Sequence, residues 1–314
     1  MKKSILVLLC ILLCLPGCGA QTEPQESDTL RIVATVFPAY DFARAAAGEG
    51  AEVKLLLPPG TESHSYEPTP ADILAVQSCD LFLCLGGESE AWVETILAAV
   101  EPQGEVLRMV DCVELLPEEH THGEEEHDHS HDHDPGAVVG MDEHVWTAPE
   151  NAAEITRKVG ETLAALDGAN AAQYRENAAA YAAKLETLDE AFEDFFAARP
   201  DRTIVFGDRF PLRYFAEAYD LDYYAAFPSC STQTEPSAAT IAFLTEKVRE
   251  ENLSTVWYIE FSNHLVADSI AEAAGADTAM FHTCHNVSGE EIESGATYLS
   301  LMEGNLATLR EKFS

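Results

Sequence analysis

Histidines are the most informative residues of this 314-residue sequence, because imidazole nitrogen and carboxylate oxygen both bind borderline divalent metals such as Zn²⁺. Six of the eleven histidines lie in one stretch that consists almost wholly of Glu, Asp and His. This pattern predicts an auxiliary metal-binding loop, which Co²⁺, Ni²⁺ or Cu²⁺ would also fit. The alternative is a solvated insertion with no metal role. The six are His120, His122, His127, His129, His131 and His133.

Outside that stretch, a second and more ordered metal site is indicated by residues in loops near predicted strand ends. In open α/β sheets, ligands bind beyond the carboxyl ends of strands, so residues from two lobes can converge there. Each residue alone is weak evidence, because an isolated loop histidine is usually solvated. The candidate ligands are His64, His144, Asp208 and His285, with His282 as an alternative to His285 and with His264 expected at the surface.

The charge balance limits the kind of partner. The chain has 18 Lys and Arg against 55 Asp and Glu, a formal net charge of −37. Nucleic acid and anionic lipid both require a cationic protein face, so this composition argues against them. An acidic protein suits solubility or a cationic ligand. Hydrophobic residues make up 46% of the chain, which is enough to fill cores.

The first residues have the layout of an export signal. Lys2 and Lys3 precede an apolar run at 5–15 that is too short to span a bilayer stably. The run ends in Leu15-Pro16-Gly17-Cys18, which resembles the lipobox of bacterial lipoproteins. We therefore expect a signal peptide at 1–17, lipidation of Cys18 and a tether at 18–29. An ordinary secretory signal is the alternative.

The cysteines agree with export. Cys10 and Cys14 would leave with the signal and Cys18 would take the lipid, so five cysteines remain. An odd number leaves at least one thiol free or paired with another chain. Cys230 and Cys284 both follow predicted strands and could form a disulfide.

Strand and helix patterns alternate in two blocks, which favours parallel sheets covered by helices. The predicted fold class is α/β: two lobes, each with a parallel four-stranded sheet flanked by helices, joined by a single long linker helix. The boundaries are 30–168 for the first lobe, with the acidic His-rich loop at 117–134, then 169–199 for the linker helix and 200–314 for the second lobe. Predicted strands are 30–36, 52–57, 80–85 and 105–110, then 203–206, 222–227, 255–259 and 278–282. A helix at 292–312 closes the chain.

Two local motifs carry a family resemblance. Leu57-Pro58-Pro59-Gly60, followed by His-Ser-Tyr-Glu-Pro-Thr-Pro at 64–70, resembles the first ligand loop of the ZnuA/TroA-type solute-binding proteins of zinc and manganese ABC importers. Asp-Glu-His-Val-Trp at 142–146 resembles the second ligand loop, and an acidic His tract before it is typical of the zinc members.

The resemblance implies an extracytoplasmic, lipid-anchored and monomeric protein on the bacterial cell membrane. It would capture a divalent metal, Zn²⁺ in preference to Mn²⁺, between its two lobes. It would then deliver the ion to a membrane permease that works with a cytoplasmic ATPase. Contact with the bilayer would run through lipidated Cys18.

The same resemblance assigns ligands. His64 and His144 match the family's first two ligands. Where zinc members place His followed by Asp, this chain has Gly207-Asp208, so either Asp208 supplies an oxygen or this loop supplies no ligand. For the last ligand, the alignment favours His285. Binding to neutral imidazoles predicts an affinity that falls below about pH 6.

Three other functions compete with this hypothesis. A manganese-specific member of the same family and a surface metal-binding adhesin or buffer both fit the residues. A secreted zinc hydrolase would use Glu143, beside His144, as a general base. The sequence contains neither HExxH nor GxSxG, and the ligands are spread over both lobes, so we expect no enzymatic activity.

Overall fold

The computed structural model describes residues 29–61, 63, 66–87, 90–100, 102–118, 140–228 and 236–313. Within them lie two parallel four-stranded sheets with the same strand order. The first, β2-β1-β3-β4, is built from β1 (Leu30–Ala34), β2 (Ala51–Leu55), β3 (Leu81–Cys84) and β4 (Glu105–Arg108). The second, β6-β5-β7-β8, is built from β5 (Thr203–Arg209), β6 (Asp222–Phe227), β7 (Thr255–Ile259) and β8 (Asp277–Phe281). The predicted fold class is confirmed.

Alternation along the strands divides the core of each lobe between two sheet faces. In β1, Ile32 belongs to the main core, whereas Val33 packs on the opposite face with residues of α2 (Pro70–Ser78) and α3 (Ala91–Ala99). In β5, Phe206 belongs to the main core, whereas Val205 packs with α7 (Ala238–Glu250) and α8 (Leu265–Ala274). Each sheet is therefore covered on both faces, as parallel sheets require.

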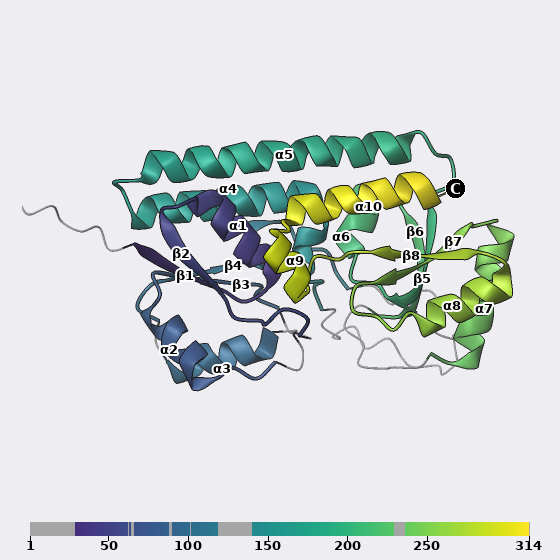
Figure 1. Cartoon of the computed structure of the whole chain (residues 1–314), viewed down its shortest axis with the longest axis horizontal. Coiled ribbons are helices and arrows are strands. Elements are labelled where there is room, and N and C mark those ends of the chain that lie inside the picture. The colour runs from purple at the N-terminus through teal and green to yellow at the C-terminus, as the bar shows by residue number, and fades with distance from the viewer. Residues whose placement is uncertain are drawn as a thin grey trace, which may run out of the picture.

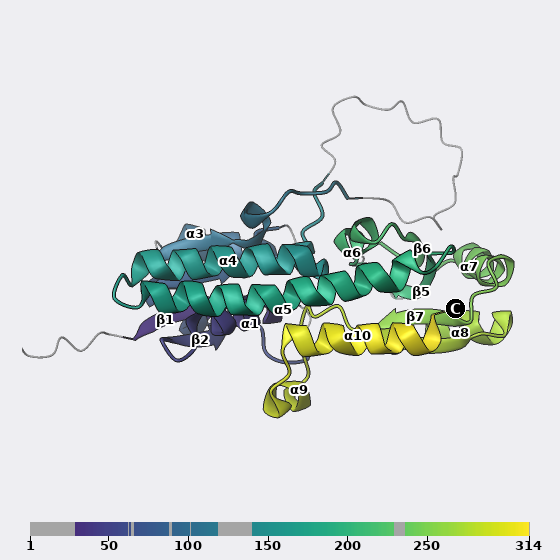
Figure 2. The same cartoon turned by 90° about the horizontal axis from the view of Figure 1, so that it is seen from above.

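The long helix α5 (Ala171–Ala197) runs along both lobes beside α4 (Pro149–Leu166), and α10 (Tyr298–Lys312) lies beside it (Figures 1 and 2). Its 27 residues give a length of about 40 Å. Buried side chains recur every three or four residues, so one apolar stripe faces the lobes. Tyr174 bonds to Gly50 of the first lobe, and Phe192 packs on Phe215 of α6 (Arg213–Ala218) in the second.

One continuous cluster of buried residues extends from Ile32 to Leu309 and draws side chains from both sheets and from α4, α5 and α10. Helix α1 (Phe37–Ala47) also contributes to this cluster. Asp41 of α1 accepts hydrogen bonds from the hydroxyl of Tyr181 on α5 and from the backbone N–H of Tyr298 on α10, at 2.6 and 3.0 Å. The two lobes are thus joined by shared packing in addition to the linker.

The chain end and β5 differ from the prediction. In place of one helix at 292–312 there are two, α9 (Gly289–Ser294) and α10. Gly295 takes the left-handed conformation (φ 77°) that ends α9, and Thr297 caps α10 through a capping box. Strand β5 continues three residues beyond Phe206, with a register shift between Phe206 and Arg209.

Cys284, one half of the predicted Cys230–Cys284 disulfide, is a free, buried thiol in this structure. Cys230, the other half, lies outside the described residues.

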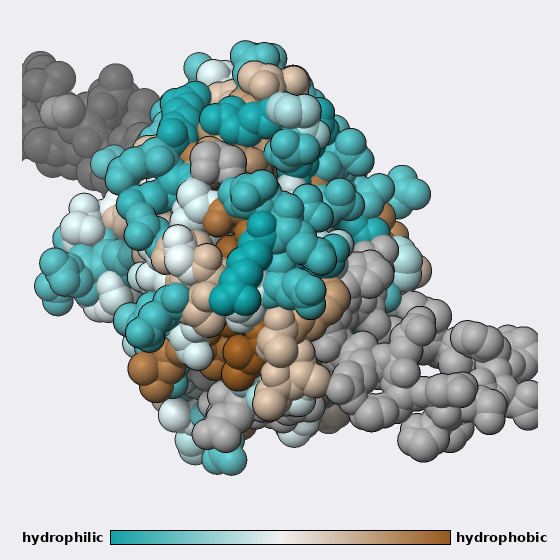
Figure 3. Space-filling view, turned by 90° about the vertical axis from the view of Figure 1, so that its right-hand side faces the viewer, coloured by the Kyte–Doolittle hydropathy of each residue, from teal (hydrophilic) through white to brown (hydrophobic). Residues whose placement is uncertain are grey.

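The second lobe turns a largely hydrophilic face to the viewer in Figure 3, with smaller apolar areas between the polar residues. Such a surface agrees with the large acidic excess of the sequence. In the described part of the chain, no helix combines the length and the apolar character needed to cross a bilayer.

Candidate metal site between the lobes

A cavity of about 420 Å³ lies where the two lobes meet, and both contribute to its walls. Three of the four residues predicted from the sequence as ligands line it: His144, Asp208 and His285. The fourth, His64, lies outside the described residues, although Ser63 next to it in the chain lines the cavity. The six histidines of the acidic stretch and Cys18 also lie outside the described residues.

His144 is held in an orientation suited to metal binding. It immediately precedes a 3₁₀ turn, Val145–Thr147, and is 2% exposed. One carboxylate oxygen of Asp142, Oδ1, accepts hydrogen bonds from the backbone N–H of His144 at 2.8 Å and from its Nδ1 at 3.0 Å. Because a carboxylate can only accept, Nδ1 carries the proton and Nε2 keeps the lone pair that a metal needs.

The electrostatics around His144 favour positive charge. Burial alone would lower the pKa of His144, but the charge and hydrogen bond of Asp142, with Glu143 and Glu118, raise it above the ordinary value of 6.5. Burial has the opposite effect on a carboxyl group: it raises the pKa of Glu90 to about 7, and the nearby charge of Glu143 also raises it. The carboxylates of Asp142, Glu143 and Glu118 therefore favour a cation at His144.

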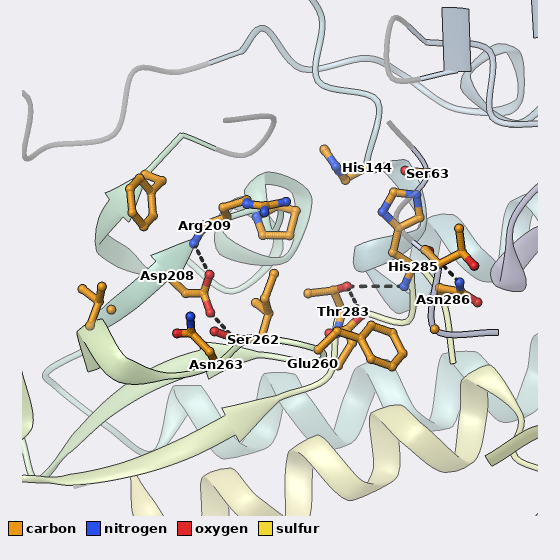
Figure 4. Close-up of a pocket in the computed structure, with 18 of the residues that line it drawn as sticks. Ser63, His144, Asp208, Arg209, Glu260, Ser262, Asn263, Thr283, His285 and Asn286 are labelled. Atoms are coloured by element: carbon orange, nitrogen blue, oxygen red, sulfur yellow. Dashed lines mark hydrogen bonds between the residues drawn. The ribbon is translucent and has the colours of Figure 1, made fainter. Parts of the chain in front are cut away.

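His285 faces His144 across the lobe boundary. Their ring centroids are 6.0 Å apart and the ring planes are 84° apart. Two imidazoles that share a Zn²⁺ through bonds of about 2.0–2.1 Å have centroids roughly 5–6.5 Å apart, so the observed spacing suits a common ion. The ring of Trp146, whose centroid is 5.2 Å from that of His285, packs beside the pair. Figure 4 shows the two histidines together with Ser63.

Asp208 lies on the other side of the cavity from this pair in Figure 4. Its Oδ1 accepts a hydrogen bond from the backbone N–H of Arg209 at 2.8 Å, and its Oδ2 accepts one from that of Ile259 at 3.3 Å. Among the described residues, no three His, Cys, Asp or Glu side chains are grouped closely enough to hold a metal. The structure thus brings His144 and His285 together but keeps Asp208 apart from them.

Gly207 has a packing reason for lacking a side chain. A Cβ there would lie 2.3 Å from the Cα and 2.6 Å from the backbone N of Ala267 in α8. These are backbone atoms of a helix and cannot move aside as a flexible side chain could. A histidine therefore cannot occupy position 207 in this arrangement.

His282 has structural partners and does not line the cavity. Its Nδ1 accepts a hydrogen bond from the backbone N–H of Cys284 at 2.9 Å, and its Nε2 is 3.4 Å from Glu291. The side chain of Asn305 bonds to both backbone groups of His282. His264 is about half exposed and pairs with Asp268 of its own helix, so it too lies apart from the cavity.

Glu260 is a cavity residue that the sequence did not single out as a ligand. It follows β7, beside the end of β5 that carries Asp208, and it is 8% exposed. Its two oxygens accept hydrogen bonds from the hydroxyl and the backbone N–H of Thr283, at 2.5 and 2.7 Å. Its position after a central strand of a parallel sheet was the available signal.

Comparison with known proteins gives consistent matches along nearly the whole chain. A family model described as "Zinc-uptake complex component A periplasmic" matches residues 32–312. Zinc-binding lipoprotein AdcA of Streptococcus pneumoniae (strain ATCC BAA-255 / R6) is 30% identical over 316 residues, which cover 98% of this chain and 61% of AdcA. The chain thus spans about three fifths of the length of that relative.

Two further matches cover nearly the full length of the compared protein or domain. High-affinity zinc uptake system protein ZnuA of Bacillus subtilis (strain 168) is 29% identical over 318 residues, covering 98% of this chain and 97% of that protein. The crystal structure of the Zn(II)-bound ZnuA-like domain of Streptococcus pneumoniae AdcA superposes with a TM-score of 0.73 at 28% identity. It covers 91% of this chain and 99% of that domain.

Proposed function

This chain belongs to the zinc-uptake complex component A family, and on that premise we propose that it is the solute-binding component of an ABC importer. It captures Zn²⁺ in the cavity between its lobes and delivers the ion to a membrane permease. The observation that carries the proposal is the pairing of His144 and His285, which come from different lobes and face each other at a spacing that suits one shared ion.

The proposed ligands are His64, His144 and His285, with Asp208 as an oxygen ligand from the far wall. Three nitrogen donors and one carboxylate suit tetrahedral Zn²⁺ better than Mn²⁺, which prefers more oxygen donors. The relatives named for zinc support the same choice. Asp208 must approach the histidines for all four to bind one ion, and its two hydrogen bonds to backbone N–H groups leave lone pairs on both oxygens.

The cellular setting is also proposed. Cys18 carries the lipid that anchors the protein outside the cytoplasm, as the lipoprotein name of one relative supports. The partner is a permease with its cytoplasmic ATPase, and the protein acts as a monomer. It binds metal without catalysis, because a site closed by four protein ligands leaves no position for an activated water.

Metal binding by variants of the purified protein tests this proposal. Protein loaded from an equimolar Zn²⁺ and Mn²⁺ mixture should retain zinc. His144→Ala and His285→Ala should each weaken zinc affinity by at least about 100-fold, since changes to residues that merely orient ligands already cost 10–100-fold. Asp208→Ala measures the contribution of the far wall. His264→Ala is the matched control, and an equal loss there, or retention of manganese, would contradict the proposal.

The acidic His stretch is proposed to collect zinc near the cavity. Deleting residues 118–134 should lower the number of zinc ions bound per chain and leave one high-affinity site, as measured by calorimetry. Loss of that site would show that the stretch forms part of it.

A further inference from the structure

One short segment of the second lobe, 283–287, is hydrogen-bonded to both ligand-bearing loops of the first lobe. The indole N–H of Trp146 donates to the carbonyl of Thr283 at 2.9 Å. The backbone N–H of Gly60 donates to the carbonyl of Val287 at 2.8 Å. The same segment carries His285, so its position relative to the first lobe decides whether ligands from the two lobes can meet.

Asn286 makes the most specific of these contacts. It is 4% exposed, and its Nδ2 donates to two carbonyl oxygens of the first lobe, those of Pro58 and Thr61, both at 2.8 Å. Its Oδ1 accepts a hydrogen bond from the backbone N–H of Val287 at 2.8 Å. A primary amide has two N–H donors on one nitrogen, so this one side chain spans both ends of the turn.

The turn held in this way leads directly into the cavity. The backbone N–H of Thr61 bonds to the carbonyl of Pro58 at 3.1 Å, and Gly60 takes the positive φ of 73° that the turn requires. Ser63, two residues further on, is buried and lines the cavity. His64 comes next, three residues after Thr61, and a chain of that length reaches at most about 10 Å. Asn286 thus holds the turn from which the chain continues to His64.

We propose that Asn286 is a positioning residue for the metal site: its side-chain amide holds the 58–61 turn so that His64 and His285, its own chain neighbour, are presented to the same ion. This inference rests on the proposed function, in which His64 is a ligand. Asn286 does not bind the metal, and it affects zinc affinity through His64. Orienting residues of this kind typically change metal affinity 10–100-fold.

A double-mutant cycle with zinc affinity as the readout tests the proposal. In the otherwise unchanged chain, Asn286→Ala should weaken zinc binding 10–100-fold. In the His64→Ala background, the same change should weaken it less than about threefold, because the ligand through which it acts is gone. Asn286→Asp replaces the donating amide nitrogen with a carboxylate oxygen, which is repelled by the carbonyl oxygens of Pro58 and Thr61. It should weaken zinc binding at least as much as Asn286→Ala.

Asn305→Ala is the matched control. Asn305 is equally buried and also makes two side-chain hydrogen bonds to backbone, but to His282 and not to the first lobe. Thermal melting of the metal-free proteins should show comparable destabilisation, while zinc affinity should fall mainly in Asn286→Ala. Equal losses of affinity in the two variants, or equal effects of Asn286→Ala with and without His64, would overturn the proposal alone. An unchanged affinity in His64→Ala would overturn both this proposal and the ligand set on which it rests.

Discussion

Gly207 packs against Ala267 so closely that a Cβ at position 207 would lie 2.3 Å from the Cα of Ala267. Gly207 is on β5 and Ala267 is on α8, which covers that face of the sheet. Both Gly207 and Asp208 line the cavity, and the contact explains why only Asp208 has a side chain there.

Adding a side chain at 207 should therefore destabilise the protein without improving zinc binding. Overpacking of this kind costs about 1–3 kcal/mol, so Gly207→Ala should lower the free energy of unfolding by that amount in urea titrations, and Gly207→His by at least as much. Gly304→Ala is the control, because a Cβ there meets nothing within 4 Å and alanine favours the helix by up to about 1 kcal/mol. Tighter zinc binding by Gly207→His would show that β5 and α8 separate easily.

Asp142→Asn should weaken zinc binding about 10–100-fold, although Asp142 is not a proposed ligand. The carboxylate of Asp142 accepts a hydrogen bond from Nδ1 of His144 at 3.0 Å and so keeps that nitrogen protonated. The amide of asparagine carries no charge, and it can turn its NH₂ group, which is a donor, toward Nδ1. Competition with a chelator measures the change. Asp80→Asn, in a strand-flanking residue that does not line the cavity, should leave affinity unchanged. An equal loss in both variants would contradict an orienting role for Asp142.

Zinc affinity should rise with pH up to the pKa of His144, which in the folded protein lies above the ordinary histidine value of 6.5, and should level off above that pKa. In the metal-free protein, the proton on His144 contributes stability that is fully present below about pH 6.5 and is lost as pH rises through the raised pKa. Zinc displaces that proton, so zinc affinity rises as this contribution to stability falls. Below the pKa, the rise is about tenfold per pH unit for each proton displaced.

Calorimetry between pH 5 and 8 measures this dependence. In Asp142→Asn the loss of the carboxylate lowers the pKa of His144, so the rise in affinity should shift to lower pH. Affinity that is independent of pH from 5 to 7.5 would argue against histidine ligands altogether.

Much of the fold could be predicted because most strand and helix boundaries are marked locally. Thr69 before Pro70 predicts the start of α2, and the structure shows Thr69 capping that helix. The break between α9 and α10 depends on Gly295, whose left-handed conformation is only one of several that glycine adopts, so the apolar pattern at 292–312 suggested a single helix.

The site was predicted less completely, because its geometry depends on contacts between distant segments. His144 and His285 meet across 141 positions of sequence, and only their places near strand ends and the family resemblance suggested that they would. The steric reason for Gly207 lies in Ala267, 60 positions away, and no local pattern at Phe206-Gly207-Asp208 reveals it. Glu260 directly follows β7, so its place at that edge of the sheet could have been predicted, whereas its hydrogen bonds to Thr283 could not.

The continuous core that runs from Ile32 to Leu309 has a thermodynamic consequence. Since both lobes contribute side chains to one buried cluster, neither can lose its packing without exposing apolar surface of the other. We expect the described chain to melt as one cooperative unit, with equal calorimetric and van't Hoff enthalpies, despite its two sheets. Ion capture at the lobe boundary would then stabilise the whole molecule, and a single melting temperature would report zinc occupancy.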